Sequence, residues 1–244
     1  MATVSRKQTV LKQKLLSYAI HLLTASGVVL AFWAVFLIMQ GDAANAFRVL
    51  ALAALVDSID GTLARRVDVR RYTPHIDGDL LDNLVDYLTW VFLPLLWAWT
   101  FLDVPFLVCA AAMLCSMLGF AHKHAKTEDH FFRGFPSYWN LVVLYLFLLD
   151  AGAATSSVVV LILAAMVLTP VKLVYPSRTP ALQKTTLLLS VPYIIMLGVM
   201  LFYFEATPVW IVYLSLYYPL YYTVISLYLV KSPVYPTKND QKEQ

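Results

Sequence analysis

Eight apolar stretches, each close to the length of a membrane-spanning helix, take up almost the whole chain. A helix needs about 20 mostly apolar residues to cross the hydrocarbon core of a bilayer. With 60% hydrophobic and 14% charged residues, the chain is also far more apolar than a soluble domain of this size. We therefore predict an all-α integral membrane protein of about eight transmembrane helices, over residues 15–39, 43–64, 79–102, 104–122, 138–152, 154–174, 182–204 and 208–230.

The charged residues between these stretches alternate in sign along the chain. Cytoplasmic connections of membrane proteins are rich in Lys and Arg, so the basic connections and both termini are predicted to be cytoplasmic. The net charge of +3 then reflects this orientation and contact with anionic lipids, and it does not indicate nucleic-acid binding. The acidic connections carry Asp42, Asp103, Asp150 and Glu205, whereas the basic ones carry Arg6, Lys7, Lys12, Lys14, Arg65, Arg66, Arg70, Arg71, Lys123, Lys126, Arg133, Lys172, Arg178, Lys184, Lys231, Lys238 and Lys242.

Little of the sequence is left outside the apolar stretches. Residues 1–14 are predicted to form a cytoplasmic segment, and one interpretation of their lysine-rich pattern is an interfacial helix. This start has no short apolar core and cleavage site of a secretory signal. Residues 231–244 are predicted to form a cytoplasmic tail, and we expect no soluble domain.

Two pairs of aspartates lie at the ends of the second and third stretches. Asp57 and Asp60 are three residues apart and Asp82 and Asp86 are four apart, so each pair shares one face of a helix. A charge inside a membrane span costs at least about 2.5 kcal/mol, and several carboxylates together also repel one another. We therefore expect cations between the two helices.

The neighbouring residues fit a metal-assisted reaction at phosphate. Oxygen ligands alone suit Mg²⁺ or Mn²⁺, and two such ions about 3.5–4 Å apart form a clamp for displacement at phosphorus. Gly61 and Ala64 leave space beside the first pair, and Arg65 offers a planar cation. Gly78 repeats the clearance one turn before Asp82. A helix cap or a surface ion pair would explain one pair of acids, but two pairs with matched glycines favour a metal site.

The pattern Asp57-x-x-Asp60-Gly61-x-x-Ala64-Arg65, followed by Gly78-x-x-x-Asp82-x-x-x-Asp86, resembles the signature of the CDP-alcohol phosphatidyltransferases, bacterial and other membrane enzymes of phospholipid synthesis. The spacing between Arg65 and Gly78 is longer than in many members by about one helical turn. This spacing and the stretches "FRGFPSYWN" and "VKLVYPSRT" are similar to the bacterial branch that makes phosphatidylcholine, and the second stretch also resembles enzymes that make phosphatidylserine. The resemblance implies a six-helix catalytic core in residues 15–180 and two additional helices in residues 181–230.

The resemblance also implies a reaction and a role for each matching residue. An alcohol hydroxyl attacks the lipid-side phosphorus of CDP-diacylglycerol, and CMP leaves. The metal ligands would be Asp57, Asp60, Asp82 and Asp86, which hold two Mn²⁺ or Mg²⁺ ions, and Asp86 would also be the catalytic general base. The residues implied to bind CDP-diacylglycerol are Gly61, Ala64, Arg65 and Gly78, with His21 and Thr24 at positions where many members have Asn and Thr. A homodimer in the bacterial inner membrane, with its active site facing the cytoplasm, is implied as well.

Aromatic residues near the predicted site suggest how choline would bind. A quaternary ammonium group donates no hydrogen bond and is held against aromatic faces. Tyr138 and Trp139 begin the fifth stretch at the cytoplasmic side, and Tyr87 and Trp90 lie beside Asp86. We predict these four aromatic residues as choline contacts, although interfacial anchoring explains the same residue types.

Two further clusters admit two interpretations each. Lys172, Ser177 and Arg178 either bind the phosphates of CDP-diacylglycerol or obey the orientation rule. The loop with His122, His124, Glu128, Asp129 and His130 matches no zinc spacing, so a solvated loop is favoured over a zinc site.

Two other functions remain open at this point. The same chemistry could act on another alcohol, serine foremost. A cation-coupled or proton-coupled transporter also carries acids within its membrane spans, but its sites tend to lie at mid-membrane on broken helices, often in two related halves. Here the acids cluster at one face without a repeated partner set, which favours the enzyme.

Overall fold

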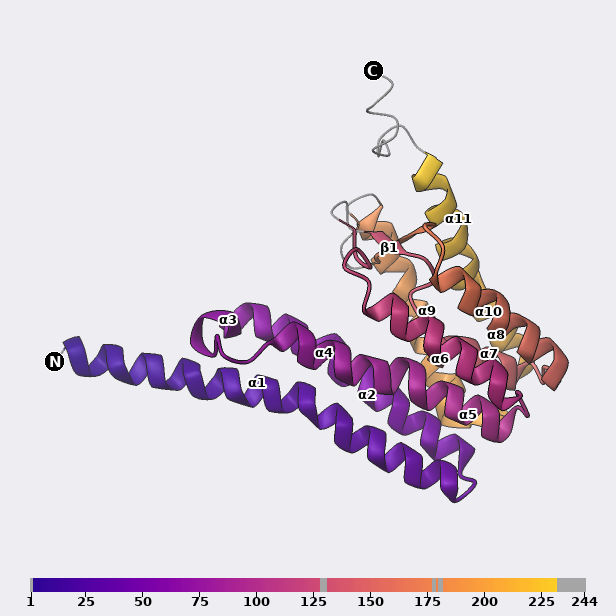
Figure 1. Cartoon of the computed structure of the whole chain (residues 1–244), viewed down its shortest axis with the longest axis horizontal. Coiled ribbons are helices and arrows are strands. Elements are labelled where there is room, and N and C mark those ends of the chain that lie inside the picture. The colour runs from indigo at the N-terminus through magenta and orange to yellow at the C-terminus, as the bar shows by residue number, and fades with distance from the viewer. Residues whose placement is uncertain (1, 128–130, 177–178, 180–181, 232–244) are drawn as a thin grey trace. The chain divides into compact units, whose positions relative to one another are not determined.

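The computed structural model describes residues 2–127, 131–176, 179 and 182–231, and this part of the chain is mostly helical (Figure 1). It divides into two compact units, Met1–Trp97 and Ala98–Gln244. Helix is present in each of the eight predicted stretches, although the helix in 154–174 ends at Val167, and this confirms a mostly helical membrane protein. Within the described residues, four helices are long and apolar enough to span a membrane: Gln8–Met39, Gly78–Phe101, Gln183–Ala206 and Val209–Leu229. Three shorter apolar helices accompany them.

The first unit contains one long helix and several shorter helices that pack along it. Its elements are α1 (Ala2–Met39), α2 (Ala43–Val67), α3 (Val69–Tyr72), α4 (Gly78–Asp86), the π-helix η1 (Tyr87–Phe92) and the start of α5 (Leu93–Phe101). Helix α1 packs against α2, α3, α4 and η1 (Figure 1). The elements that carry the predicted aspartates are therefore all held against one helix.

Capping and a buried tryptophan fix the start of α2. Gly41 has a positive φ of 76°, which allows the tight turn after α1, and the carboxylate of Asp42 accepts hydrogen bonds from the backbone and side-chain nitrogens of Asn45 at 3.0 and 2.7 Å. The side-chain hydrogen bond lowers the pKa of Asp42. The Nε1 atom of Trp97 donates to the carbonyl oxygen of Ala43 at 3.1 Å, which ties the far end of the unit to the same turn.

The helix after the second aspartate pair widens into a π-helical segment. Residues 87–92 form η1 directly after Asp86, where the sequence predicted one uninterrupted helix. Thr89 and Val91 are buried within it, and the Thr89 hydroxyl donates to the carbonyl oxygen of Val85 at 3.0 Å. Segments of this kind are rare and are often found at functional sites.

The second unit is a set of apolar helices with a small two-stranded sheet. In chain order its elements are α6 (Phe106–Phe120), β1 (Phe131–Arg133), α7 (Trp139–Leu148), α8 (Ala153–Val167), β2 (Lys172–Val174), α9 (Gln183–Tyr203), the 3₁₀-helix η2 (Phe204–Ala206), α10 (Val209–Ser215) and α11 (Tyr217–Lys231). The last predicted stretch is broken at Leu216, because Pro219 has no N–H group to donate to the carbonyl oxygen of Ser215.

The two strands correct the prediction of a purely α-helical chain. They are antiparallel, with Phe131 opposite Val174, Phe132 opposite Leu173 and Arg133 opposite Lys172. Each strand has three residues and they lie far apart in the sequence, so no local pattern could indicate their pairing. The Val174 N–H donates to the Ser226 hydroxyl at 3.0 Å, which fastens the sheet to α11.

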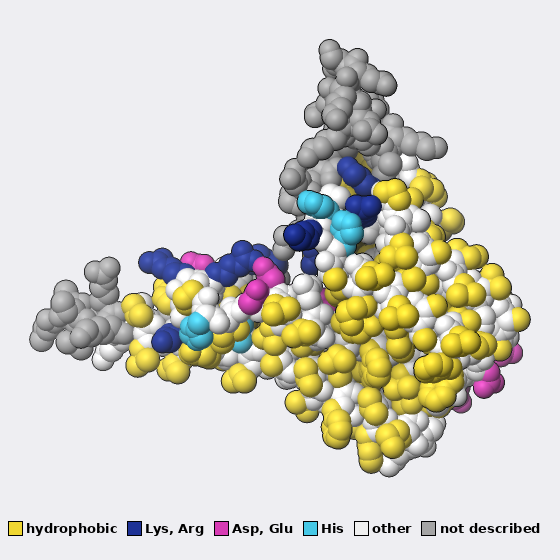
Figure 2. Space-filling view, viewed as in Figure 1, with side chains coloured by type: hydrophobic (Ala, Val, Ile, Leu, Met, Phe, Trp, Pro, Cys, Tyr) yellow, Lys and Arg dark blue, Asp and Glu magenta, His cyan; other side chains and the backbone are white. Residues whose placement is uncertain are grey.

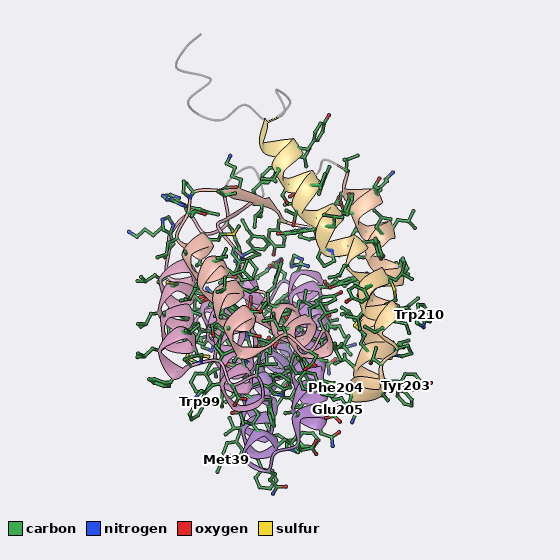
Figure 3. All side chains as sticks on the ribbon, turned by 90° about the vertical axis from the view of Figure 1, so that its right-hand side faces the viewer. Met39, Trp99, Tyr203, Phe204, Glu205 and Trp210 are labelled. Atoms are coloured by element: carbon green, nitrogen blue, oxygen red, sulfur yellow. The ribbon has the colours of Figure 1, made fainter. Side chains whose placement is uncertain are left out.

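The surface of the described residues has the polarity of a membrane protein. Large apolar side chains lie exposed along the helices (Figure 2), for example Leu107 at 78% and Leu188 at 72%. In the second unit, Trp99, Tyr203 and Trp210 point outward on the part away from the strands, where Glu205 also lies (Figure 3). Exposed aromatic rings beside an acidic connection are typical of a membrane interface.

The contact between α1 and α4 depends on one glycine. A methyl group at Gly27 would lie 2.4 Å from Cγ1 of Val85, which is buried and β-branched and so cannot move aside easily. We predict that Gly27→Ala lowers the stability of the protein by about 1–3 kcal/mol, the usual cost of overpacking. Thermal unfolding in detergent would measure this.

The matched control for this change is Gly198→Ala in α9. An added Cβ at Gly198 meets nothing within 4 Å, so alanine should leave the melting temperature unchanged or raise it. Equal melting temperatures for the two variants would show that the α1–α4 contact is not tight.

Candidate active site

Three aspartates from two helices converge in the first unit. Asp57 lies near the end of α2, and Asp82 and Asp86 lie one turn apart on α4. One carboxylate oxygen from each of the three lies within 4.8 Å of the other two, and all three residues are half-buried. Among the described residues, this is the group of acids, histidines or cysteines that is arranged to hold a metal ion.

The connection between the two helices is anchored to α1 by histidines. His21 on α1 shares a hydrogen bond between its Nε2 and the Thr73 hydroxyl at 2.9 Å, and both residues are buried. Nearby, the Tyr18 hydroxyl lies 2.9 Å from Nε2 of His75. These contacts hold the segment that leads from α3 into α4. Tyr18, Thr73 and His75 were not singled out from the sequence. The spacing of three residues between Tyr18, His21 and Thr24 on α1 was a signal for Tyr18.

Asp60 lies outside the group of three. It follows Asp57 by three residues on α2 and is only 3% exposed. The prediction that Asp60 also binds metal is not tested by this geometry. A nearly buried carboxylate beside three others nevertheless adds to the negative potential of the site.

The arrangement of the three oxygens fits a hard divalent cation. An octahedral ion with bonds of about 2.1 Å places its ligand oxygens about 3–4.2 Å apart. Oxygens within 4.8 Å of one another need only small side-chain rotations to reach that spacing. The donors are carboxylates alone, which suits Mg²⁺ or Mn²⁺ rather than zinc.

The glycine and arginine after Asp60 lie together. A Cβ at Gly61 would lie 3.4 Å from Nη1 of Arg65, and Nη2 of Arg65 donates to the Thr62 hydroxyl at 3.1 Å. The Ala64 carbonyl accepts the N–H of Asp68, which ends the helix with a positive φ of 58°. The guanidinium group is exposed at the end of α2, where it can meet an anionic ligand.

His21 and Gly78, which are both predicted to bind the nucleotide, lie next to each other. A Cβ at Gly78 would lie 3.3 Å from Cε1 of His21, so the first residue of α4 lies against the imidazole ring. Thr24 lies on the same helix, is 9% exposed and donates to the carbonyl oxygen of Ile20 at 3.4 Å. The structure therefore places His21 next to Gly78, and Thr24 about one turn further along α1.

Other acids near the site have structural partners. The Asp77 side chain accepts the N–H of Leu80 at 3.0 Å and so caps α4. Asp79 pairs with Arg70 at 2.5 Å, and both side chains are more than three-quarters exposed. This hydrogen bond and the charge of Asp79 raise the pKa of Arg70. Asp79 is thus a surface residue.

The remaining predicted site residues lie in both units. Tyr87 and Trp90 are half-buried on η1 of the first unit. In the second unit, Tyr138 is half-buried before α7, and Lys172 begins β2 with its Nζ atom 5.8 Å from the centre of the Phe131 ring. Ser177 and Arg178 lie outside the described residues, as do Glu128, Asp129 and His130 of the loop considered for zinc.

Trp139 has a packing role in the structure. Its side chain is fully buried, and its Nε1 atom donates to the Ser116 hydroxyl on α6 at 2.9 Å. The Ser137 hydroxyl donates to the same oxygen at 3.1 Å. These bonds fix the start of α7, so Trp139 positions its neighbour Tyr138.

Comparison with known proteins identifies the class that this fold and acidic site define. Residues 16–171, more than half of the chain, match the model of the CDP-alcohol phosphatidyltransferase family. The phosphatidylcholine synthase of Legionella pneumophila is 34% identical over 240 residues, which cover 93% of this chain and 94% of that protein. The phosphatidylcholine synthase of Agrobacterium fabrum is 37% identical over 200 residues, covering 80% and 83%. That of Legionella bozemanae is 40% identical over 160 residues, covering 62% and 72%.

The chain belongs to the CDP-alcohol phosphatidyltransferase family. It is a bacterial integral membrane enzyme of phospholipid synthesis, and its family generally uses divalent metal ions. The family predicted from the aspartate signature is therefore confirmed. The acceptor alcohol and the individual ligands are matters of proposal.

Replacing single carboxylates tests the site. We predict that Asn at Asp57, Asp60, Asp82 or Asp86 lowers turnover at least about a hundredfold, the scale of removing a general base or an electrostatic stabiliser. Folding should survive, because one negative charge fewer relieves repulsion in the metal-free protein. Release of CMP from CDP-diacylglycerol measures the effect.

Asp79→Asn on the same helix is the matched control. It removes an exposed carboxylate with a surface partner, so activity should stay within a fewfold of the wild-type value. Near-normal activity of Asp82→Asn would exclude the acidic group as the metal site.

Proposed function

We propose that this enzyme transfers the phosphatidyl group of CDP-diacylglycerol to choline and releases CMP. The observation that carries the proposal is the convergence of Asp57, Asp82 and Asp86 in a chain related over 93% of its length to a phosphatidylcholine synthase. The acidic site supports chemistry at a diphosphate, and the relatives support the choice of acceptor. The reaction forms the bond from the choline oxygen to the lipid-side phosphorus and breaks the bond from that phosphorus to the CMP oxygen.

We propose two divalent ions, Mn²⁺ or Mg²⁺, held by Asp57, Asp60, Asp82 and Asp86. When bound, the ions neutralise charge on the diphosphate and on the departing CMP. The protein supplies the fixed placement of the ligands, because α2 and α4 are both packed on α1. Asp60 would join as a ligand from its buried position one turn along α2.

Asp86 is proposed to act as the general base. It is half-buried at the end of α4, where a carboxylate can accept the proton of an incoming hydroxyl while partly shielded from water. Asp86 is the last residue of α4 and directly precedes the π-helix η1, so helical hydrogen bonding holds its backbone on both sides. Asp82, one turn earlier, would remain bound to metal throughout.

CDP-diacylglycerol is proposed to bind beside the middle of α1, the end of α2 and the start of α4. Gly61 and Gly78 leave room for the CDP group, Arg65 pairs with phosphate, and His21 and Thr24 lie beside the cytidine. In the second unit, Arg133 and Lys172 stand opposite each other in the sheet, where like charges repel and a bound phosphate would relieve the repulsion. This register supports Lys172 as a phosphate contact, and Ser177 and Arg178, which lie outside the described residues, are proposed from the sequence alone.

Choline is proposed to bind against aromatic faces. Tyr138, Tyr87 and Trp90 are half-buried and so have accessible ring surface. Trp139 is included in the proposal through its position next to Tyr138, since its own indole is fully buried. Each aromatic face in contact with a quaternary ammonium contributes about 0.5–2 kcal/mol.

The proposal includes an orientation in the membrane. We propose eight spans, with a six-helix catalytic core in residues 15–180 and two further spans in residues 181–230. Residues 1–14 and 231–244 would then be cytoplasmic in the bacterial inner membrane, with the active site on the same side. A homodimer is proposed from the family resemblance alone.

Removal of metal should abolish the reaction. Because the donors are carboxylates, we predict no CMP release after treatment with EDTA and full recovery with Mg²⁺ or Mn²⁺. Dialysed enzyme with each metal added in turn gives the measurement. Activity that survives rigorous chelation, or that returns with Zn²⁺ alone, would contradict the oxygen-only site.

The acceptor should be selected by methylation of its nitrogen. We predict the order choline, then dimethylethanolamine, then ethanolamine, with no product from L-serine, whose carboxylate would be repelled by the acidic site. CMP release from purified enzyme with each alcohol measures this order. Efficient use of serine without turnover of choline would overturn the proposed acceptor and leave the family assignment unchanged.

A further inference from the structure

Four aromatic rings from distant parts of the second unit meet beside the two-stranded sheet. We call Phe132, Tyr138, Tyr175 and Tyr222 the aromatic corner. The rings of Phe132 and Tyr138 are 6.2 Å apart between centroids and inclined at 88°. Tyr138 and Tyr222 are 6.5 Å apart and inclined at 62°, and Tyr175 stacks on Phe132 at 4.4 Å. Tyr138 is thus steeply inclined to both Phe132 and Tyr222, whereas Tyr175 and Phe132 are nearly parallel, at 27°.

The sheet and α11 hold these rings in place. Phe132 and Tyr175 lie on the same side of the ribbon, because Phe132 is opposite Leu173 and side chains alternate along a strand. The Tyr222 hydroxyl donates to the carbonyl oxygen of Val174 at 3.0 Å, which joins α11 to β2. The corner is therefore built from the segment before α7, the segment after α8, and helix α11.

The four rings are less buried than the core residues near them in the fold, although Tyr222 also packs against the buried cluster of Phe131, Val174, Ile225 and Leu229. Phe131 and Trp139, the sequence neighbours of Phe132 and Tyr138, are 1% and 0% exposed and fill the interior. All four rings of the corner are only half-buried. The basic pair, Arg133 and Lys172, lies on the other side of the ribbon, so it does not share the face that carries Phe132.

Inclined, partly exposed rings suit a cation that makes no hydrogen bonds. A quaternary ammonium is attracted by the faces of Tyr and Phe, and several faces at different inclinations can contact its methyl groups together. A hydrogen-bonding cation such as ethanolammonium would lose water contacts that rings cannot replace. The corner is thus matched to the chemical group that distinguishes choline from other alcohols.

We propose that the aromatic corner binds the trimethylammonium group of choline, with Tyr222 and Tyr138 as its specificity-determining residues. This inference rests on the proposed function and assigns Phe132, Tyr175 and Tyr222 to acceptor recognition. Tyr222 lies beyond residues 16–171, which match the family model. The last helix therefore completes an acceptor site that the family core alone does not contain.

Kinetics of the full-length enzyme test the corner. We expect Tyr222→Leu and Tyr138→Leu each to raise the choline KM about tenfold, with the KM for CDP-diacylglycerol and kcat within about threefold, because the lost contact belongs to the acceptor. Tyr222→Phe keeps the ring and should stay within about threefold of the wild type in choline KM. Tyr228→Leu is the matched control on α11, since Tyr228 is 65% exposed, and it should change nothing.

A competitor tests the same idea without any variant. Tetramethylammonium has the methyl groups of choline but no hydroxyl, so it should inhibit wild-type enzyme competitively with choline. The neutral isostere 3,3-dimethylbutan-1-ol should inhibit at least about tenfold more weakly, because it lacks the charge that the rings attract.

The outcomes separate the two proposals. If the wild type uses choline but neither leucine variant raises the choline KM, or if tetramethylammonium does not compete, the aromatic corner is overturned and the proposed function stands. If the wild type releases no CMP with choline, the proposed function fails and this inference fails with it. A tenfold rise confined to the choline KM, together with competition by tetramethylammonium, supports the inference.

Discussion

Helix α1 packs against both α2 and α4, and the clearance at Gly27 sets how closely α4 can approach. The carboxylates of Asp57, Asp82 and Asp86 repel one another, so no attraction between them explains their convergence. Packing on α1 and the anchoring of the connecting segment by His21 hold them together instead. The acidic group is therefore assembled by the fold itself, and in the proposed function a bound cation would relieve the repulsion that the fold maintains.

In the proposed function, the second unit faces a different physical problem, because the trimethylammonium group that it would bind offers no hydrogen bonds. Its small sheet is fastened to α11 through Val174, which uses both its N–H and its carbonyl group in hydrogen bonds to side chains of that helix. Polar side chains thus hold the backbone, and aromatic faces remain for the ligand. The first unit has the opposite distribution, in which apolar packing holds helices that present charged groups.

The sequence was sufficient to predict the parts of the fold that depend on local spacing. Apolar length predicted where the helices lie, and the interval between Asp82 and Asp86 predicted a shared face. The pairing of β1 with β2 could not be predicted, because it joins short segments across two helices. The burial of Trp139 and the bond from His21 to Thr73 also depend on tertiary contacts. The break before α11 had a visible cause in Pro219, yet apolar length alone concealed it.

The π-helical turns of η1 lie within one continuous helix, Gly78–Phe101. They change the direction in which side chains after the segment point, relative to those before it. In an uninterrupted α-helix, Trp97, which follows Asp86 by eleven residues, would point in nearly the same direction as that carboxylate. The π-helical segment swings Trp97 to the carbonyl of Ala43 while Asp86 still faces Asp57. A π-helical segment holds about one more residue than the α-helical turns it replaces, so loss of one residue between 87 and 92 would leave an ordinary α-helix with Asp86 and Trp97 still in their present directions. The helix from Gly78 to Phe101 can therefore carry an extra residue here without turning either the acidic site or the tryptophan anchor away from its partner.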